Sequence, residues 1–334
     1  MRTCWVLDHP AHVRLLAELL RNGNTSDLII ACDRPEVRSM LEQGDGKLPR
    51  RQTLWVPRAV GRGRYRKALY RVRSVQLFLN RANRDGQGPV ERLVGVGAAL
   101  EMLAAKPRWW RPSTVKERWY ITDTEVNHRA HAIAKKSATH AVVPVHWRAD
   151  LDGGFLASFR GVVKQLDGLH GHVHLVPHRR PTSVASPPRI VVRSLRGGGV
   201  HDGNELVPIP QEALVGLDIT NADEDRYQGH PWDLDIELAL HDGVITQSVT
   251  LASEAVLLGT PTLLVSKAER GFLDRLEREG APLFRWRGAA DTRDWEAVYA
   301  QFLSGLHLTD ALDAASWPGA KEQLTQWLCP PLRG

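Results

Sequence analysis

The stretch TQSVTLASEAVLLGTP, residues 246–261, indicates the fold of this chain more clearly than any other segment. A short apolar run at 243–245 precedes it, and a second one at 262–265 follows it. Between the two runs lie a polar turn, a helix with Glu254 one turn in, and Gly259 before Thr260 and Pro261. This order predicts a strand, a helix closed by a glycine cap and a second strand, the repeating unit of an α/β fold.

Polar residues at the start of this predicted helix point to a phosphate-binding site. Ser248 and Thr250 can cap the helix, where free backbone N–H groups and the helix dipole favour an anion. The carboxylate of Glu254 can accept hydrogen bonds from two sugar hydroxyls. These residues predict a nucleoside diphosphate ligand, with its phosphates at the helix N-terminus and its ribose at Glu254. The alternative is an ordinary capped helix with a solvated Glu254.

The same stretch resembles the donor-nucleotide motif of GT-B proteins, which include nucleotide-sugar glycosyltransferases and non-hydrolysing UDP-N-acetylglucosamine 2-epimerases. In the epimerases the motif reads roughly T-D-S-G-G-x-x-x-E-A-x-x-x-G-x-P, and the residues that match it here are Thr246, Ser248, Glu254, Ala255, Gly259 and Pro261. Gln247 replaces the Asp, and Val249 and Thr250 replace the glycine pair. Without these glycines, close approach of the backbone to a phosphate is harder.

Length and composition predict a two-domain protein of the reducing cytoplasm. The chain has 334 residues, of which 43% are hydrophobic, enough for two cores. No stretch approaches the roughly 20 apolar residues of a membrane span, and the N-terminal apolar run indicates a first strand rather than a signal peptide. Cys4, Cys32 and Cys329 are isolated, which argues against a disulfide framework or a zinc ribbon.

Positive charge is concentrated between Arg50 and Arg84, where ten arginines and one lysine occur without an Asp or Glu. From about Tyr65 to Arg81 the apolar residues recur as in an amphipathic helix. Such a helix suits an anionic membrane surface, or nucleic acid, or is a helix with one buried stripe and a solvated arginine face. We expect the membrane surface, with these residues as its contacts: Arg62, Arg64, Arg66, Lys67, Arg71 and Arg73.

Strand-like and helix-like segments alternate along the whole chain, which predicts parallel sheets covered by helices, with ligands beyond the carboxyl ends of the strands. A Pro- and Ser-rich stretch at 177–188 indicates a linker. We therefore expect a GT-B architecture of two Rossmann-like domains whose parallel sheets face a cleft. Residues 1–177 form the acceptor domain, 178–188 the linker and 189–334 the nucleotide-sugar domain with its closing helices. In GT-B proteins the last helix usually crosses back to the first domain.

The N-terminus, WVLDHPAHVRLLAELLRNG at 5–23, resembles a domain-of-unknown-function family of archaeal and bacterial GT-B-like proteins. Its members begin with an apolar strand, an Asp, a His-Pro-x-His helix start and a glycine-ended helix. Further segments that resemble the family are the acidic strand end at 121–125, Gly168-Leu169 and the Val191-Val192-Arg193 strand. The resemblance extends from about residue 3 to residue 287.

The residues expected to act on an acceptor follow the predicted strands of the first domain. His12 resembles the loop histidine of GT-B transferases with lipid-linked acceptors, and a neutral imidazole at a helix start can act as general base. His9 is expected to cap or pack. Asp8, Asp123 and Glu125 lie at strand ends. Glu125 and Arg129 match the V-E-A-G-x-R segment of the epimerases, whereas their second acidic position and their T-x-H-R-x-E-N segment are absent here, which argues against epimerisation.

The donor site is expected in the second domain, where Arg193, Ser194 and the turn at 196–199 can bind a diphosphate. Its other members are Ser248, Thr250 and Glu254. Three alternating histidines, His170, His172 and His174, would share one face of a strand and offer zinc ligands. They adjoin the predicted linker without a nearby Cys or Glu, so we expect no metal and no cofactor. GT-B transferases neutralise the leaving diphosphate with basic residues and a helix dipole.

The sequence thus predicts a glycosyltransferase that moves a sugar from a nucleotide-sugar, expected to be UDP-linked, to a glycan or lipid-linked acceptor. His12, Asp123 and Glu125 are the expected catalytic residues. The predicted setting is polysaccharide biosynthesis in the cytoplasm, with peripheral contact at the inner membrane face and no nucleic-acid partner. The alternatives are an enzyme like the sugar-nucleotide 2-epimerases and a non-catalytic protein of the same fold that binds polyanions.

Overall fold

A computed structural model describes residues 1–42, 47–59, 61–176, 178, 181, 183–195, 205–223, 226–291, 293–307 and 319–329. The chain divides into two compact units, one of Met1–His174 with Gly319–Gly334 and one of Leu175–Pro318. We call them the first and the second unit. This division differs from the predicted domain boundary at the C-terminal end, because residues 319–334 belong to the first unit rather than to the second. The whole of the predicted 196–199 turn lies outside the described residues, which resume at 205.

The first unit contains a parallel seven-stranded sheet with the order β3-β2-β1-β4-β5-β6-β7. Its five inner strands are buried along almost their whole length, as expected for a sheet covered on both faces, whereas the two edge strands are partly exposed. The predicted α/β class with parallel sheets is confirmed. The strands are β1 (Arg2–Leu7), β2 (Leu28–Cys32), β3 (Gln52–Val56), β4 (Val90–Val96), β5 (Glu117–Ile121), β6 (His140–Pro144) and β7 (Val162–Leu166).

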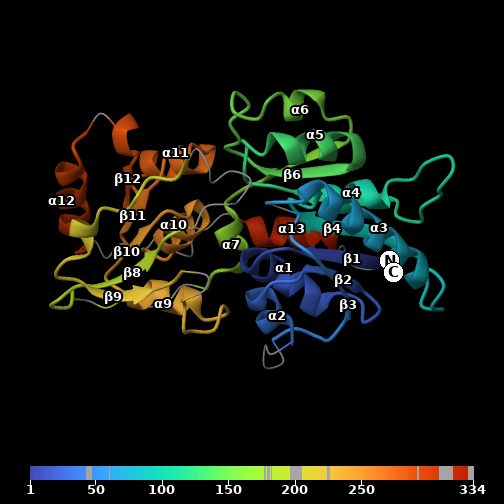
Figure 1. The fold of residues 1–334 in the computed structure, drawn as a ribbon, viewed down its shortest axis with the longest axis horizontal. Coiled ribbons are helices and arrows are strands. Elements are labelled where there is room, and N and C mark those ends of the chain that lie inside the picture. Colours follow the sequence, from blue (N-terminus) through green and yellow to red (C-terminus); the bar gives the residue numbers. More distant parts are fainter. Residues whose placement is uncertain are drawn as a thin grey trace. The chain divides into compact units, whose positions relative to one another are not determined.

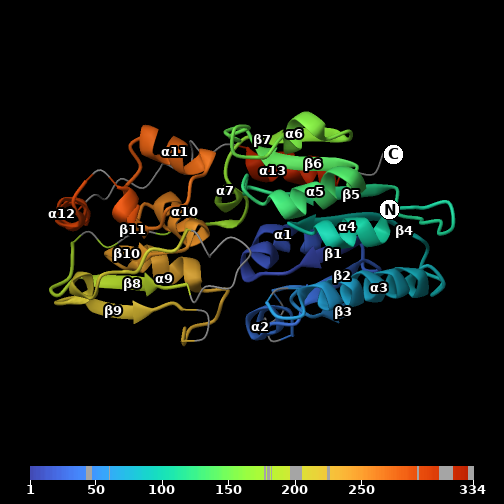
Figure 2. The same cartoon turned by 45° about the horizontal axis from the view of Figure 1, so that its top comes forward.

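The helices of the first unit form two groups of neighbours around this sheet (Figures 1 and 2). In one group α3 packs on α4 and α4 on α5, while in the other α1 packs on α2 and α7, and α7 on α13. The bounds are α1 (Pro10–Asn22), α2 (Pro35–Glu42), α3 (Arg64–Ala82), α4 (Ala99–Ala105), α5 (His128–Ser137), α6 (Phe155–Ser158), α7 (His170–His174) and α13 (Ala320–Leu328).

Helix α13 returns from the far end of the sequence to the first unit through specific contacts. It packs on β7 and α7. Gln323 accepts a hydrogen bond from the backbone N–H of Asp167 at 2.9 Å, and the Arg92 guanidinium donates to the carbonyl of Leu328. This is the return of the last helix that the GT-B resemblance implied.

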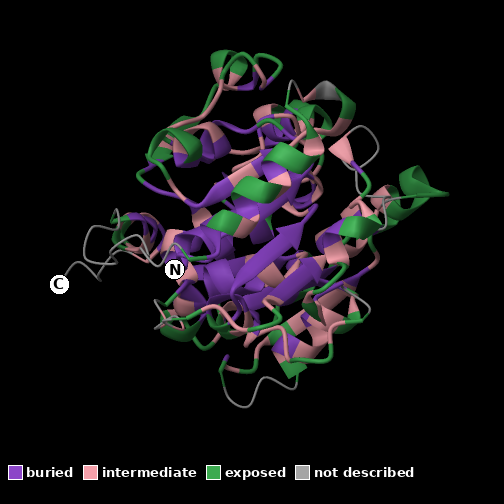
Figure 3. Ribbon diagram, turned by 90° about the vertical axis from the view of Figure 1, so that its left-hand side faces the viewer, coloured by how far each residue is buried: buried purple, intermediate pink, exposed green. Residues whose placement is uncertain are grey.

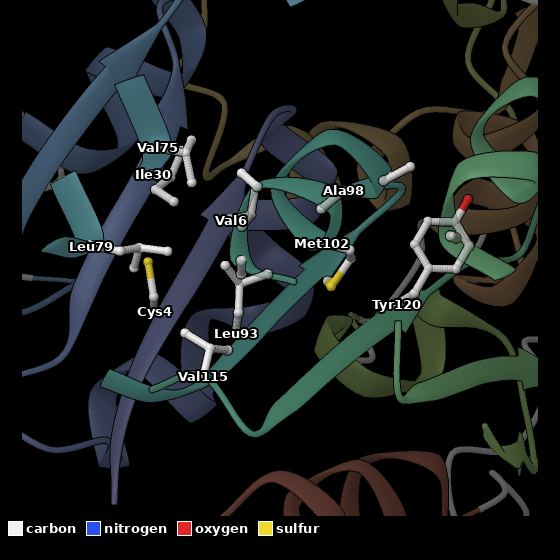
Figure 4. Close-up of a cluster of buried hydrophobic side chains, with 14 of the residues drawn as sticks. Cys4, Val6, Ile30, Val75, Leu79, Leu93, Ala98, Met102, Val115 and Tyr120 are labelled. Atoms are coloured by element: carbon white, nitrogen blue, oxygen red, sulfur yellow. The ribbon is translucent and has the colours of Figure 1, made fainter. Parts of the chain in front are cut away.

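Burial follows the alternation of side chains along the strands. In Figure 3 the central strands are buried, whereas the surrounding helices carry exposed outer faces. Cys4 and Val6 of β1 point into one core together with Val75 and Leu79 of α3, as Figure 4 shows. Trp5, from the opposite face of β1, is also buried and donates its indole N–H to Asp27 at 3.0 Å. Both faces of the sheet are therefore covered.

The second unit contains a parallel five-stranded sheet with the order β12-β11-β10-β8-β9. The strands are β8 (Arg189–Arg193), β9 (Asp218–Asn221), β10 (Gly243–Thr246), β11 (Thr262–Val265) and β12 (Leu283–Trp286). The helices are α9 (Leu234–Leu240), α10 (Val249–Leu257), α11 (Gly271–Arg278) and α12 (Trp295–Gly305), with single 3₁₀ turns at Gln211–Leu214 and Gly288–Ala290.

The stretch at 246–261 folds as its sequence predicts. Ser248 caps α10 by accepting the N–H of Leu251 at 3.3 Å, and α10 ends before Gly259. Gly259 has φ +80°, the left-handed conformation that a helix end of this kind favours in glycine. Thr260 then donates its N–H to Ala255 at 2.9 Å and turns the chain into β11.

Candidate functional site

Both sheets reverse their strand order at one point, where open α/β sheets bind ligands. In the first unit the reversal lies between β1 and β4, and in the second between β8 and β10. The first reversal is occupied by an ion network. Arg71 Nη2 donates to both carboxylate oxygens of Asp8 at 2.7 and 2.6 Å, and Arg71 Nε contacts Glu101. Asp8 comes from the end of β1, Arg71 from α3 and Glu101 from α4.

The position of Arg71 corrects one sequence prediction. Arg71 is 4% exposed and therefore does not belong to a membrane-facing surface. Burial alone would lower its pKa, but the Asp8 and Glu101 carboxylates outweigh that effect and raise the pKa of Arg71 above its usual range. The guanidinium is therefore a permanently charged link that fixes Asp8 at the end of β1.

Two histidines lie in the loop and first turn after Asp8. His9 is the N-cap of α1, and its Nδ1 accepts the N–H of Ala11 at 3.2 Å, which is the capping role expected for it. The His9 and His12 ring centroids are 5.8 Å apart. Nδ1 of His12 is shielded from water and has no hydrogen-bond partner among the residues that the structure describes.

His12 is held in its neutral form. Burial and the neighbouring His9 ring lower the pKa of His12 to about 3, against the opposing effect of the Asp8 and Asp123 carboxylates. A neutral imidazole accepts a proton, but a base of such low pKa drives proton transfer weakly near neutral pH. The predicted role of His12 as general base therefore needs help from a neighbouring group.

The side chains of Asp123 and His170 contact each other at the carboxyl edge of the same sheet. Asp123 follows β5, and its Oδ2 lies 3.1 Å from Nδ1 of His170, the first residue of α7. Asp123 Oδ1 also accepts the hydroxyl of Thr124 at 3.0 Å. A carboxylate that orients a histidine in this way stabilises the imidazolium that forms when the other ring nitrogen takes a proton. Both side chains remain partly exposed, by 25% for Asp123 and 15% for His170.

A third histidine, His131 of α5, holds the loop that carries Asp123. His131 Nε2 lies 3.0 Å from the carbonyl of Thr124 and 3.1 Å from that of Glu125, so Nε2 carries the proton. The hydroxyl of Tyr120 then donates to Nδ1 at 3.2 Å. Burial lowers the pKa of His131 to about 4, even though the two carbonyls oppose the shift. His131 has no counterpart among the residues predicted from sequence, because an isolated histidine in a helix carries no motif.

Glu125, the third predicted catalytic residue, lies in the interior of the first unit. Its side chain is fully buried, and its Oε1 accepts the backbone N–H of Arg148 at 3.2 Å. This carboxylate therefore supports the loop that contains Arg148. Among the predicted catalytic residues, the structure therefore brings together His12 and Asp123, with His170 beside them.

The three alternating histidines correct another expectation. Residues 170–174 form the helix α7 rather than a strand, so residues two apart do not share a face. His172 Nδ1 accepts the N–H of Leu169 at 2.8 Å, and His174 Nδ1 lies 3.0 Å from the carbonyl of His170. Within the described part of the chain, no group of His, Cys, Asp or Glu side chains has the arrangement of a metal site.

In the second unit Arg193 and Thr246 face each other in register at the ends of β8 and β10, where the strand order reverses. Helix α10 begins two residues after β10. Its cap uses the N–H of Leu251, while helix geometry leaves those of Val249 and Thr250 without an intrahelical acceptor. Thr250 is exposed and Ser248 half-buried. This end of the sheet has the donors that a phosphate requires.

Glu254 and Gln247 are both withdrawn from water. Glu254 is 2% exposed, which excludes the alternative of a solvated helix residue. Gln247 occupies the place of the motif's Asp and acts as a clamp: its Oε1 accepts the N–H of Leu195 at 2.7 Å, and its Nε2 donates to the carbonyl of Val207. Asp223 accepts the N–H of Ser194 at 2.6 Å. Because these two N–H groups already have acceptors, the backbone amides of Ser194 and Leu195 are not available to a ligand.

The predicted basic surface is present on α3 and the loop before it. The exposed cationic residues of this surface are Arg62, Arg64, Arg66, Lys67 and Arg73. Tyr65, Leu69, Tyr70 and Leu77 are exposed among them. In the described ranges, no helix is both long and apolar enough to span a membrane.

Comparisons with known proteins identify the fold. No protein-family model matches the chain, and no curated protein matches it in sequence. The resemblance to a family of unknown function therefore remains a prediction. Among solved structures, S. aureus MnaA in a co-structure with UDP has a TM-score of 0.58 at 10% identity, over 99% of this chain and 98% of the other.

Two further solved structures match this chain over nearly the whole length of both proteins. The putative UDP-N-acetylglucosamine 2-epimerase of Listeria monocytogenes has a TM-score of 0.56 at 10% identity and covers 98% of this chain and 95% of its own. MurG of Acinetobacter baumannii has a TM-score of 0.53 at 12% identity, and the match covers 98% of this chain and 99% of MurG. At these identities the likeness concerns the fold. The chain has the GT-B architecture of two Rossmann-like units.

Proposed function

We propose that this protein is a glycosyltransferase that moves a sugar from a nucleotide-sugar to an acceptor hydroxyl. The observation that carries the proposal is the contact between the Asp123 carboxylate and Nδ1 of His170 at the carboxyl edge of the first sheet. A carboxylate-oriented histidine is suited to removing a proton from a hydroxyl group. The second unit supplies a separate anion site, at the reversal point between β8 and β10.

In the proposed reaction His170 is the general base and Asp123 orients its ring. The acceptor O–H bond breaks, its proton passes to Nε2 of His170, and the acceptor oxygen forms a bond to the anomeric carbon of the sugar. The bond between that carbon and the diphosphate oxygen breaks, so a nucleoside diphosphate leaves. His12, neutral and next to the pair, offers a second acceptor for a hydrogen bond from the hydroxyl.

The donor is proposed to bind in the second unit. Arg193 and the start of α10, with Ser248 and Thr250, would hold the diphosphate, and the exposed hydroxyl of Ser194 would add a hydrogen bond. Glu254 would accept the ribose hydroxyls. The similar structure of MnaA was solved with UDP, which supports a uridine nucleotide as the first ligand to test. No metal is needed in this scheme, because cationic side chains and the helix dipole stabilise the leaving group.

A lipid-linked or other membrane-bound glycan is the proposed acceptor, since the basic face of α3 suits an anionic bilayer. The proposed membrane contacts are Arg62, Arg64, Arg66, Lys67 and Arg73, without the buried Arg71. This assignment places the protein in polysaccharide biosynthesis at the inner membrane face.

A 2-epimerase is the second candidate. One of the similar structures is a putative UDP-N-acetylglucosamine 2-epimerase, and another was solved with UDP. Epimerisation needs an acid and a base on opposite faces of the sugar. Glu125, which matches the epimerase acid by its position in the sequence, is buried. An epimerase would turn over UDP-N-acetylglucosamine without any acceptor, whereas a transferase would not.

The first test is a thermal-shift panel of UDP-, GDP-, dTDP- and CMP-sugars and their free nucleotides. A ligand at a hundred times its dissociation constant stabilises the folded protein by about 2.7 kcal/mol. We expect one nucleotide series to stabilise the wild type, and Glu254→Ala to abolish that shift. Stabilisation by none of the compounds would overturn the donor site and favour a non-catalytic polyanion-binding protein.

Because Glu254 is buried, a second variant separates lost binding from lost folding. Thr250→Glu places a carboxylate in the first turn of α10, where it favours the helix but repels a diphosphate. We expect this variant to keep the melting temperature of the free protein and to lose the nucleotide shift. Exposed Glu296→Ala, in the first turn of α12, is the matched control and should retain the shift.

A further inference from the structure

An exposed pair of tryptophans forms the tip of a small hairpin between α4 and β5. Arg108 and Arg111 exchange two backbone hydrogen bonds, each 2.9 Å long, and so enclose a two-residue turn. The two residues in the turn are Trp109, 91% exposed, and Trp110, 59% exposed. The loop that contains them projects from the first unit, at the right of Figures 1 and 2.

Hydrogen bonds and a cation–π contact hold the hairpin in a defined conformation. The guanidinium of Arg111 donates to the carbonyl of Lys106 at 3.0 Å, and that of Arg108 lies 5.3 Å from the Trp110 ring centroid. At its base, Thr114 donates its hydroxyl to the carbonyl of Val90 at 2.7 Å. Indole rings held in water at a fixed position leave apolar area uncovered, which is unfavourable unless another surface covers it.

Charge around the tip indicates what that surface is. Residues 106–116 contain four cations, Lys106, Arg108, Arg111 and Lys116, and no Asp or Glu. Glu91 is paired with Lys116 at 2.8 Å and Glu117 with Arg92 at 2.6 Å, so the excess of positive charge near the tip comes from Lys106, Arg108 and Arg111. The partner is therefore anionic as well as apolar.

The C-terminal end of the basic helix α3 adjoins the same hairpin. Asn83, the C-cap of α3, donates from its amide to Thr114 at 2.9 Å. Arg81 and Arg84 on either side of Asn83 are exposed. Asp85 is paired with Arg2 at 2.7 Å, so it does not cancel their charge. Cationic residues therefore extend from the tip to the end of α3.

We propose that the hairpin tip is an interfacial anchor that inserts Trp109 and Trp110 among the headgroups of an anionic bilayer. Tryptophan favours the membrane–water interface because its ring is apolar with one polar N–H, and flanking cations bind acidic lipid. The proposal concerns recruitment and does not depend on any catalytic assignment, so it stands or falls separately from the glycosyltransferase.

Two other occupants fit the hairpin less well. Single-stranded nucleic acid stacks its bases on exposed aromatic faces, but here the two indoles meet edge to face, 5.2 Å apart at 83°, and do not form a platform. A second copy of the same hairpin would bring the cations Lys106, Arg108 and Arg111 against the same three cations. An anionic lipid surface can bind the cations and also cover the apolar surface of the two indole rings.

Co-flotation of the full chain with vesicles tests the proposal. We expect binding to vesicles of phosphatidylcholine with phosphatidylglycerol, weakened by salt, and little binding to phosphatidylcholine alone. The double variant Trp109→Ala/Trp110→Ala should lower the partition coefficient by about tenfold or more. Val215→Ala, an equally exposed apolar residue of the second unit, is the control and should bind as the wild type does.

Quenching by brominated lipids gives a readout on the wild type itself. Part of the tryptophan fluorescence should be quenched on binding, and that part should be missing in the double variant. The proposal is overturned if the wild type ignores anionic vesicles, if the folded double variant binds them as tightly, or if binding occurs without quenching. Loss of single-stranded oligonucleotide binding in the double variant, with vesicle binding intact, would assign the hairpin to nucleic acid instead.

Discussion

Asp123 and His170 are far apart in the sequence, yet Oδ2 of Asp123 lies 3.1 Å from Nδ1 of His170. The pair joins the end of β5 to the first residue of α7 at the carboxyl edge of the first sheet. His12 of α1 lies near both, since each affects its pKa. A carboxylate and two histidines from three parts of the first unit therefore lie close together, at the site that we propose for deprotonation of an acceptor hydroxyl.

Removing His170 should slow the chemical step without weakening donor binding. We expect His170→Ala to lower kcat by about 10²- to 10⁴-fold, the usual contribution of a general base. Asp123→Asn should have a similar effect, and the double variant should be little worse than either, because the two residues act as a unit. Steady-state kinetics on the identified donor measure this. The exposed His307→Ala is the control, and a His170→Ala enzyme with wild-type kcat would remove the pair from the mechanism.

Arg71 should contribute strongly to stability because it joins two carboxylates in the interior. Replacing it with Met leaves Asp8 and the buried Glu101 without their cation, so we expect a loss of about 3–5 kcal/mol in the free energy of unfolding. Arg71→Lys should retain only part of this stability, since a lysine ammonium cannot bind two carboxylates as the planar guanidinium of arginine does. Urea titration measures both.

The matched control for Arg71 is Arg73→Met, an exposed position on the same helix, which should change stability by no more than about 0.5 kcal/mol. Adding Glu101→Gln to Arg71→Met should restore part of the loss, because one uncompensated charge disappears. Equal effects of the Arg71 and Arg73 substitutions would contradict the proposed importance of the network.

His12 should make the protein sensitive to acid. Its pKa is lowered to about 3 in the folded state, whereas an unfolded histidine titrates near about 6.5. Below about pH 6.5 the unfolded chain takes up a proton that the folded chain excludes, so stability is fully present above that pH and is lost as the pH falls toward 3. His12→Asn removes this dependence.

Urea titrations at several pH values check the His12 prediction. Between about pH 6.5 and 5, the wild type should lose up to about 2 kcal/mol more than His12→Asn. His131, whose pKa is lowered to about 4, changes stability in the same direction but is present in both proteins, so it cancels. His307→Asn should follow the wild type. Parallel stability curves for His12→Asn and the wild type would show that His12 is protonated equally in both states.

The side-chain amide of Gln247 should contribute to stability, although the epimerase motif that this segment resembles has an Asp at that position. Gln247→Glu keeps an acceptor for the Leu195 N–H but places a carboxylate oxygen against the carbonyl of Val207. We expect a loss of about 1–3 kcal/mol in stability, with a weaker nucleotide shift because the segment after β8 is no longer held. Differential scanning calorimetry measures the first effect, and exposed Gln301→Glu is the control. An unchanged melting temperature would mean that the clamp adds nothing.

The local elements follow from the sequence because short-range physics determines them. The helix α1 starts at Pro10, and Ser248 caps α10 with Gly259 beyond its end, as the sequence pattern predicts. The amphipathic period likewise predicts α3 to within about a residue at each end. The exposed edge strand β9 (Asp218–Asn221) carried too weak an apolar pattern to be recognised.

Tertiary structure alone decided which polar residues meet. Arg71 has the same charge and helical setting as Arg73, but its side of α3 faces Asp8 and Glu101, so it is buried. His170 was expected on a strand with His172 and His174, but it begins the helix α7 and contacts Asp123. The hydrophobic periodicity of the sequence predicts which residues become buried. The partners of a buried charge come from distant strands and helices, and only the packed sheet brings them within hydrogen-bond distance.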